Sequence, residues 1–179
     1  DYFKLFASLK ESEINISRII HLWSLNNTTA KVEYNPENIN YIQEVGFFSL
    51  LNIAKAIEKE RINKELEIIV FSNNIVEIIG GDLINPIGAT IFGPVRVIPQ
   101  EFANVSCRLV DIDNKYIDKY VLELFANNIN KNVAYRNGIR WEEDYMHSNI
   151  QISADANPRL KNQGVYLILG GNGGIGLTI

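Results

Sequence analysis

The sequence predicts an α/β protein with a largely parallel sheet, and two observations lead to this fold class. Short apolar runs rich in β-branched and aromatic residues alternate along the chain with longer segments whose apolar residues recur every three or four positions. The first pattern is typical of strands and the second of amphipathic helices. In addition, one of the strand-like runs is almost continuously apolar, which indicates a strand that is covered on both faces.

The first third of the chain is expected to form a helix, a strand and a longer helix. The spacing of Phe3, Phe6 and Leu9 predicts a short helix at the start. Residues 17–25 are rich in β-branched and aromatic side chains and predict the first strand. Residues 41–60 have one apolar face and a charged end, as in an amphipathic helix. The residues of this face, which we expect to be buried against the sheet, are Phe47, Leu50, Leu51, Ala54 and Ile57.

The middle of the chain continues the alternation less clearly. Residues 66–71 form the nearly continuous apolar run and predict a buried strand, and residues 75–79 predict a second short strand that returns after an Asn-Asn turn. Residues 87–101 are ambiguous. Because Pro94 and Pro99 limit a regular helix, we expect a short or broken one there.

The next segments predict a strand, a helix and a hairpin. Residues 105–111 are again typical of a strand, and residues 115–127 suit a helix. Residues 133–136 and 139–141 flank Asn137-Gly138, the strongest two-residue signal for a hairpin turn. The residues expected on the apolar face of the helix are Ile117, Val121, Leu122, Leu124 and Phe125.

The C-terminal part of the chain is expected to begin a second structural unit. Residues 147–163 are polar, have no clear period and predict a connector, whereas residues 164–169 predict a strand. We therefore expect one unit over residues 1–160 and the opening of another over residues 161–179.

Composition excludes several classes of function. The formal net charge is −4 at an isoelectric point of about 5.3, which argues against a nucleic-acid partner. No apolar stretch approaches the ~20 residues of a membrane helix, so no membrane partner is expected. The single cysteine, Cys107, cannot form an internal disulfide and fits a reducing, cytoplasmic compartment.

A glycine-rich segment is the strongest chemical signal in the sequence. Gly170, Gly174 and Gly176 have the spacing G-x-x-x-G-x-G directly after the last expected strand. Glycines there let a phosphate approach backbone N–H groups, and a following helix N-terminus would favour its negative charge. The alternative interpretation is a flexible glycine-rich end. The expected cofactor-binding residues are Gly170, Gly171, Asn172, Gly173, Gly174, Ile175 and Gly176.

Other polar candidates favour structural roles. His21 lies in an apolar strand and is expected to be a packed core histidine, and Cys107 a small core residue. His147 lies near three acidic residues without metal-ligand spacing, so we expect a solvated turn and no metal site. Arg96 and Glu101 could pair with each other or face a partner half of the protein. Trp23 and Trp141 are expected as core anchors.

Six blocks, in order along the chain, resemble the N-terminal, structural part of a ketoreductase domain from a modular polyketide synthase. Any one block is weak evidence, but six in the right order are specific. One position departs from the family pattern: Leu169 precedes the first glycine where the family usually has threonine, which removes a hydroxyl able to brace the loop. The blocks are residues 20–25, 46–51, 93–101, 107–111, 134–140 and 166–177.

The resemblance implies a truncated Rossmann-like three-layer fold that has lost its own nucleotide site and supports a second, short-chain dehydrogenase half. That half would bind NADPH and reduce a β-ketoacyl group held on an acyl carrier protein. Its catalytic Ser, Tyr and Lys would lie beyond Ile179, so no catalytic residue is assigned within the chain, and the chain alone is not expected to reduce a ketone. The implied partners are the remainder of the ketoreductase domain, the carrier protein with its β-ketoacyl chain, and neighbouring synthase domains.

Two further classes of function stay open at this point. The chain could be a non-catalytic scaffold, a pseudo-ketoreductase that braces a neighbouring synthase domain such as a methyltransferase. A free-standing dinucleotide-binding protein is a third class, but it would need a cofactor helix after the glycines.

Overall fold

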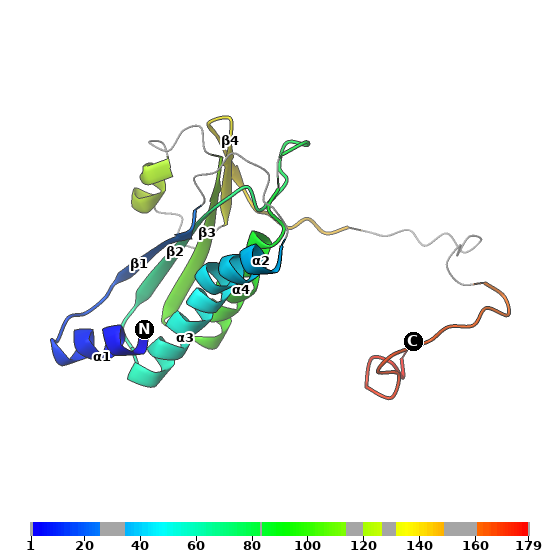
Figure 1. The fold of residues 1–179 in the computed structure, drawn as a ribbon, viewed down its shortest axis with the longest axis horizontal. Helices are drawn as coiled ribbons and strands as arrows, with labels where there is room; N and C mark the ends of the chain where they lie inside the picture. The colour runs from blue at the N-terminus through cyan, green and yellow to red at the C-terminus, as the bar shows by residue number, and fades with distance from the viewer. Residues whose placement is uncertain are drawn as a thin grey trace. The chain divides into compact units, whose positions relative to one another are not determined.

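The sheet at the centre of the chain has five strands in the order β1-β2-β3-β4-β5 (Figure 1). In this computed structural model, residues 2–25, 35–82, 84–113, 120–126, 132–148 and 161–178 are described, and they form two units, Asp1–Asp144 and Tyr145–Ile179. The first four strands are parallel and β5 is antiparallel to β4. The expected mostly parallel α/β architecture is therefore confirmed. The strands are β1 (Arg18–Ser24), β2 (Leu66–Asn73), β3 (Val105–Ile112), β4 (Val133–Arg136) and β5 (Ile139–Glu142).

The expected helix over residues 41–60 starts earlier and is irregular. Asn35 caps its N-terminus by accepting a hydrogen bond from the Asn38 N–H, and Pro36 occupies the first turn, where no N–H is required. The helical path then contains a π-helical turn and ends at Arg61, which has a left-handed backbone conformation. Its three parts are α2 (Pro36–Gln43), η1 (Glu44–Phe48) and α3 (Ser49–Glu60).

The two remaining helices of the first half match the expectations from sequence. The short helix at the start is α1 (Tyr2–Glu11). The proline-containing segment forms a 3₁₀ turn, η2 (Gly88–Ile91), followed by the short helix α4 (Phe92–Glu101). Pro94 lies in the first turn of α4 and Pro99 in its last, so neither interrupts its centre.

Helices α1, α3 and α4 pack on one face of the sheet (Figure 1), and the larger part of the core lies beneath them. Alternate residues of β2 and β3 face this layer, among them Ile68, Val70 and Leu109. The intervening residues Ile69 and Val110 face the other side, where Tyr120 and Tyr135 complete a second, smaller cluster. Both faces of the central strands are therefore buried, as the apolar run of β2 predicts.

The connection between β3 and β4 differs from the two before it. Its described part contains η3 (Val121–Phe125), preceded by Tyr120, which packs on the face opposite to α3 and α4. The described part of this connection therefore lies on the face opposite to the helices that join β1 to β2 and β2 to β3.

A buried ionic network holds η3 on that face. The Glu123 side chain accepts hydrogen bonds from Arg108, Tyr135 and Arg140, and the Arg108 Nη1 to Glu123 Oε2 distance is 2.9 Å. Burial alone would raise the pKa of Glu123, but hydrogen bonds from these three side chains outweigh burial and lower it. Removing one partner of such a network would leave a buried charge without compensation.

Several expectations from sequence are wrong, and packing explains each. Residues 75–79 form no strand, because Asp111 and Asp82 take up backbone N–H groups of this segment. In the expected helix over 115–127, the described part is the short 3₁₀ turn η3, in which Val121, Leu122 and Phe125 are exposed while Glu123 is buried. Ile117 lies outside the described residues. Trp23 and Trp141 are 63% and 41% exposed and are not core anchors.

The buried face of α3 also differs by one position from the expectation. Leu50 and Ile57 are buried as expected, together with Ile53 and Ala56. Phe47, Leu51 and Ala54 are half-buried. Leu51 and Ala54 line a surface groove between α3 and α4. The helix is therefore rotated so that its inner stripe is centred on Leu50 and Ile53.

His21 is a packed core histidine, as expected. It lies on β1, is 2% exposed and shares a hydrogen bond of 2.9 Å between its Nε2 and the Ser49 Oγ of α3. The same Ser49 hydroxyl lies 2.6 Å from the Tyr2 hydroxyl of α1. Desolvation lowers the pKa of His21 from 6.5 to about 4.

Substituting Leu50 should cost far more stability than substituting its neighbour Leu51. Leu50 is 0% exposed in the core, so Leu50→Ala should lower the free energy of unfolding by about 2–5 kcal/mol. Leu51→Ala, on the groove side, should cost clearly less. Denaturant unfolding of both variants measures the difference, and equal losses would show that the assigned rotation of α3 is wrong.

Acid should weaken the fold through His21. The unfolded chain binds a proton at His21 near pH 6.5 and the folded chain only near pH 4, so the full contribution is present above about pH 6.5. The free energy of unfolding should fall by ~3 kcal/mol as the pH drops from 6.5 to 4. In His21→Gln this part of the pH dependence should disappear, whereas His147→Gln, at an exposed site, should keep it. An unchanged pH dependence in His21→Gln would refute the assignment.

Candidate functional site

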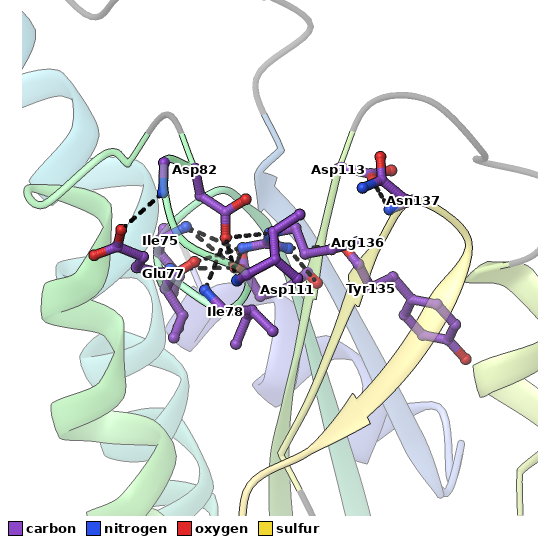
Figure 2. Close-up of polar contacts among 12 residues, drawn as sticks. Ile75, Glu77, Ile78, Asp82, Asp111, Asp113, Tyr135, Arg136 and Asn137 are labelled. Carbon is purple, nitrogen blue, oxygen red and sulfur yellow. Dashed lines mark hydrogen bonds and ion pairs between the residues drawn. The ribbon is translucent and has the colours of Figure 1, made fainter.

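The carboxyl edge of the parallel strands is where open α/β sheets bind their ligands. In this chain β2 ends at Asn73 and β3 at Ile112, and the segment from Asn74 to Asp82 lies beside both ends. Figure 2 shows the side chains that meet there. This edge is therefore the candidate binding site of the first unit.

Asp111 occupies the centre of this edge. It is 0% exposed, and its carboxylate accepts hydrogen bonds from the Ser72 hydroxyl of β2 and from the Ile75 and Val76 N–H groups. The Arg136 Nη2 of β4 donates to Asp111 Oδ2 at 2.6 Å. One carboxylate thus joins β2, β3, β4 and the segment after β2.

Arg136 completes the cluster from the other side. Its guanidinium also donates to the Val76 and Asp111 carbonyl oxygens, and its Nε lies 3.2 Å from Asp82 Oδ2. Burial alone would raise the pKa of Asp82, but hydrogen bonds from the Ile78 and Ile79 N–H groups and the charge of Arg136 hold it below its ordinary value. The donors and acceptors of this cluster are directed at one another (Figure 2).

A second set of bonds fixes the neighbouring turn. Asn137 and Gly138 both have positive φ, 52° and 75°, as the hairpin signal predicts. The Asn137 N–H donates to Asp113 Oδ2 at 2.6 Å, and the Tyr120 hydroxyl donates to the same carboxyl group. The end of β3 is therefore tied to the hairpin and to the start of η3.

The space left beside this cluster is small. A cavity of about 130 Å³ is lined mainly by apolar groups, among them Val76, Ile78, Phe92 and Trp141. Sites for cofactors are typically ~300–1,000 Å³. Among the residues that the structure describes at this edge, the cavity is too small for a dinucleotide and the polar groups beside it already bind one another, so these groups hold the sheet together.

Sequence analysis did not single out Asp111, Arg136 or Asp82. Asp111 and Arg136 belong to strand-like blocks in which charged residues would ordinarily face solvent. The only available signal was their position, since each lies near the end of an expected strand.

The expected cofactor-binding residues lie in the second unit. Gly170 has a φ of +82°, and its carbonyl accepts a hydrogen bond from the Gly173 N–H. A Cβ on Gly176 would lie 2.5 Å from the Gly171 Cα, so only glycine allows this close approach. A Cβ on Gly174 would meet nothing within 4 Å. The Leu177 N–H donates to the Gly173 carbonyl, the four-residue step with which a helix begins.

This segment fits the phosphate part of a nucleotide. Its turn is built from residues without side chains or with small ones, and a helix-like step follows it. The described residues 161–178 contain no strand or completed helix. A strand that reads the ribose is therefore not among them.

The expected strand over residues 164–169 is wrong for this chain. The segment forms no strand, and Val165, Leu167 and Leu169 are 100%, 87% and 88% exposed. A strand requires a neighbour for its backbone groups, and the apolar sequence alone cannot supply one. The expected boundary at residue 160 falls outside the described residues.

The other candidates have structural surroundings. Cys107 is buried, and desolvation raises the pKa of its thiol to about 12, so it is unreactive at neutral pH. Arg96 pairs with Glu143, not with Glu101, and its guanidinium lies over the Phe92 ring. Within the described ranges, His, Cys, Asp and Glu form no group that could hold a metal ion. None of the helices described is long and apolar enough to cross a membrane.

Comparison with known proteins gives one family match and several similar proteins. The model of the family described as "Beta-ketoacyl synthase-like, N-terminal" matches residues 1–128. The chain is 26% identical over 162 residues to the polyketide synthase PksN of Bacillus subtilis (strain 168), a match that covers 87% of this chain and 3% of PksN. The chain thus spans only a small part of that relative.

Three solved structures share the fold. One is a multidomain structure with adenylation, ketoreductase and pseudo Asub parts from a keto acid-selecting NRPS module. It has a TM-score of 0.69 at 22% identity, and the match covers 99% of this chain and 15% of that chain. An N-terminal ketoreductase from a macrolactin assembly line has a TM-score of 0.59 at 19% identity, and the match covers 98% of this chain and 34% of that chain. A short chain dehydrogenase from Mycobacterium avium has a TM-score of 0.59 at 11% identity, and the match covers 87% of this chain and 63% of that chain.

These findings confirm the fold class and the resemblance to ketoreductase domains of polyketide synthases. The similarity to solved structures shows the Rossmann-like α/β fold. The family match shows family membership, because it extends over more than half of the residues. The chain belongs to the family described as Beta-ketoacyl synthase-like, N-terminal.

Proposed function

We propose that the first unit is the structural half of a ketoreductase domain in a polyketide synthase, and that it supports NADPH-dependent reduction of a β-ketoacyl group to a β-hydroxyacyl group. One observation carries this proposal: in the described part of the carboxyl edge, Asp111, Arg136 and Asp82 bind one another at the ends of the strands. A Rossmann-like sheet whose ligand edge is filled by its own ion pairs serves packing and not cofactor binding.

Residues 161–179 are the proposed opening of the catalytic half. In the intact domain the NADPH pyrophosphate would lie against the backbone of Gly170, Gly171, Asn172, Gly173, Gly174, Ile175 and Gly176. NADPH, when bound, supplies the hydride for ketone reduction. The contribution of this segment is to let the phosphates approach its backbone closely and to begin the helix whose N-terminus favours their charge.

The proposed partners follow from this placement. The remainder of the ketoreductase domain would complete the nucleotide site, and an acyl carrier protein would present the β-ketoacyl chain. The PksN relative is a polyketide synthase, which supports a place among neighbouring synthase domains. A reducing, cytoplasmic setting agrees with the single buried thiol.

The structural role predicts that Asp111→Asn damages stability and not cofactor affinity. The substitution keeps the shape of the side chain but removes the charge that the Arg136 Nη2 contacts, so Asp82 alone is left to balance the buried guanidinium. The free energy of unfolding should fall by about 3–5 kcal/mol. Glu101→Gln, at an exposed helix position, is the control and should change stability by less than ~0.5 kcal/mol.

The measurement is denaturant unfolding of the chain together with NADPH titration into the intact ketoreductase domain. Asp111→Asn should lose stability while its folded fraction binds NADPH as tightly as the parent. If Asp111→Asn left stability unchanged but weakened NADPH binding, the carboxyl edge would be a cofactor site and the proposed structural role would be wrong.

Gly174→Val should abolish NADPH binding to the intact domain while leaving the turn itself formed. Gly174 has open space around its Cα and an ordinary φ, so a side chain there meets no protein atom and would fill the space proposed for the phosphate. Gly176→Val is a poorer probe, because it would collide with Gly171 and distort the turn. Asn172→Ala is the matched control and should bind NADPH normally.

Isothermal titration of NADPH into the parent domain and its Gly174→Val and Asn172→Ala variants tests this prediction. Loss of binding in Gly174→Val alone supports the phosphate role of the segment. Equal binding in Gly174→Val and the parent would exclude it. A folded parent domain that binds no NADPH at all would favour the non-catalytic scaffold.

A further inference from the structure

Strand β1 lies at the end of the sheet, and no strand of the described residues runs along its outer edge. The Glu67 N–H of β2 donates to the Ser17 carbonyl, and successive residues of a strand direct their backbone groups to alternate sides. In the regular part of β1, odd-numbered residues therefore bond to β2. The N–H groups of the even-numbered residues, Arg18 and Ile20, are directed at the open edge.

The open edge of β1 carries apolar side chains. Ile20, Leu22 and Trp23 are 43%, 52% and 63% exposed. Proteins usually protect exposed edge strands with charges, proline or bulges. The one charged residue of β1, Arg18, forms an ion pair within the sheet, and the bulge of β1 lies after His21, at the far end of the strand. The first half of β1 is therefore regular and available for pairing.

Helix α1 has the same relation to β1 as α3 has to β2. Tyr2 at the start of α1 shares a hydrogen bond with Ser49 at the start of α3, and Lys10 near the end of α1 donates to the Glu60 carbonyl at the end of α3. The two helices therefore run in the same direction on one face of the sheet (Figure 1). After each helix a short connection leads into the next strand, β1 or β2.

The hand of such units decides where a strand that enters α1 must lie. From β1 to β2 and from β2 to β3 the chain moves across the sheet in one direction, with α3 and α4 on one face. Crossovers between parallel strands have the same hand almost without exception. Because α1 lies on that face too, a parallel strand that enters α1 belongs on the side of β1 away from β2. That side is the open edge.

We propose that a parallel strand, from a segment of the same polypeptide that precedes Asp1, occupies the open edge of β1. Its backbone would bind the outward N–H groups of Arg18 and Ile20, and its apolar side chains would cover Ile20 and Leu22. A second copy of the chain, paired through a two-fold axis, would run antiparallel to β1 and would leave α1 without a strand that enters it. The inference depends on the topology of the sheet and is independent of the proposed reductase function.

Amide hydrogen exchange, read at single residues, compares the intact domain with the chain that begins at Asp1. The Ile20 N–H should exchange at least about tenfold more slowly in the intact domain, because only there does it have a strand to bind. The N–H groups of Ile19 and His21, which face β2, are the matched controls and should be slow in both proteins. Equal exchange of the Ile20 N–H in the two proteins would overturn the proposal. So would protection in the shorter chain that rises with its concentration, which would identify a second copy as the occupant.

Photo-cross-linking in the intact domain gives a readout that does not require the shorter chain to fold. Leu22→Cys is labelled with benzophenone-maleimide, since Cys107 is buried and its thiol is unreactive at neutral pH. After irradiation and digestion, the peptide linked at position 22 should come from the segment before Asp1. The same label on Ile139→Cys, an exposed position of the opposite edge strand β5, is the control and should not link to that peptide. Links from position 22 to the polypeptide after Ile179, or to a second copy, would overturn the proposal.

Discussion

The arrangement of the carboxyl edge depends on one buried carboxylate, that of Asp111. A charge at 0% exposure is tolerated only when hydrogen bonds and an opposite charge replace water. Ser72, the Ile75 and Val76 N–H groups and Arg136 do so, and they come from β2, the segment directly after it and β4. Meeting this requirement fixes the position of β4 against β3 and draws the segment after β2 across the strand ends. The packing of the described residues at this edge is a consequence of satisfying that charge.

A second buried carboxylate, that of Glu123, has a similar role on the face of the sheet opposite to α3 and α4. Glu123 binds Arg108, Tyr135 and Arg140, and thereby holds η3 against this face. Hydrophobic contact alone gives little reason for this placement, because three apolar residues of η3 face solvent. On both faces, then, charged groups decide where the less regular segments lie, while apolar burial decides the stacking of helices on strands.

Local signals predicted the parts of the fold that depend on local structure. Five of the expected strands (β1 to β5), the first helix and the Asn137-Gly138 turn follow from neighbouring residues, and the structure has them, whereas the strands expected over 75–79 and 164–169 do not form. The strand predicted over residues 75–79 does not form, because a distant carboxylate, that of Asp111, binds backbone N–H groups of this segment. The closed edge could not be foreseen, since its partners are 25 to 60 residues apart in sequence. For the glycine segment, sequence indicated the positions, whereas geometry separates Gly176, fixed by the turn itself, from Gly174, which is not.

The exposed segment from Val165 to Leu169 has a consequence for the behaviour of the chain in solution. Five consecutive uncharged and largely apolar residues, three of them with strong β propensity and several almost fully exposed, match the composition of segments that stack into intermolecular sheets. No proline or charge interrupts them. Unless neighbouring strands cover it, this stretch makes the colloidal stability of the chain dependent on concentration. The tendency of the chain to aggregate then depends on a segment outside the five strands of the described sheet.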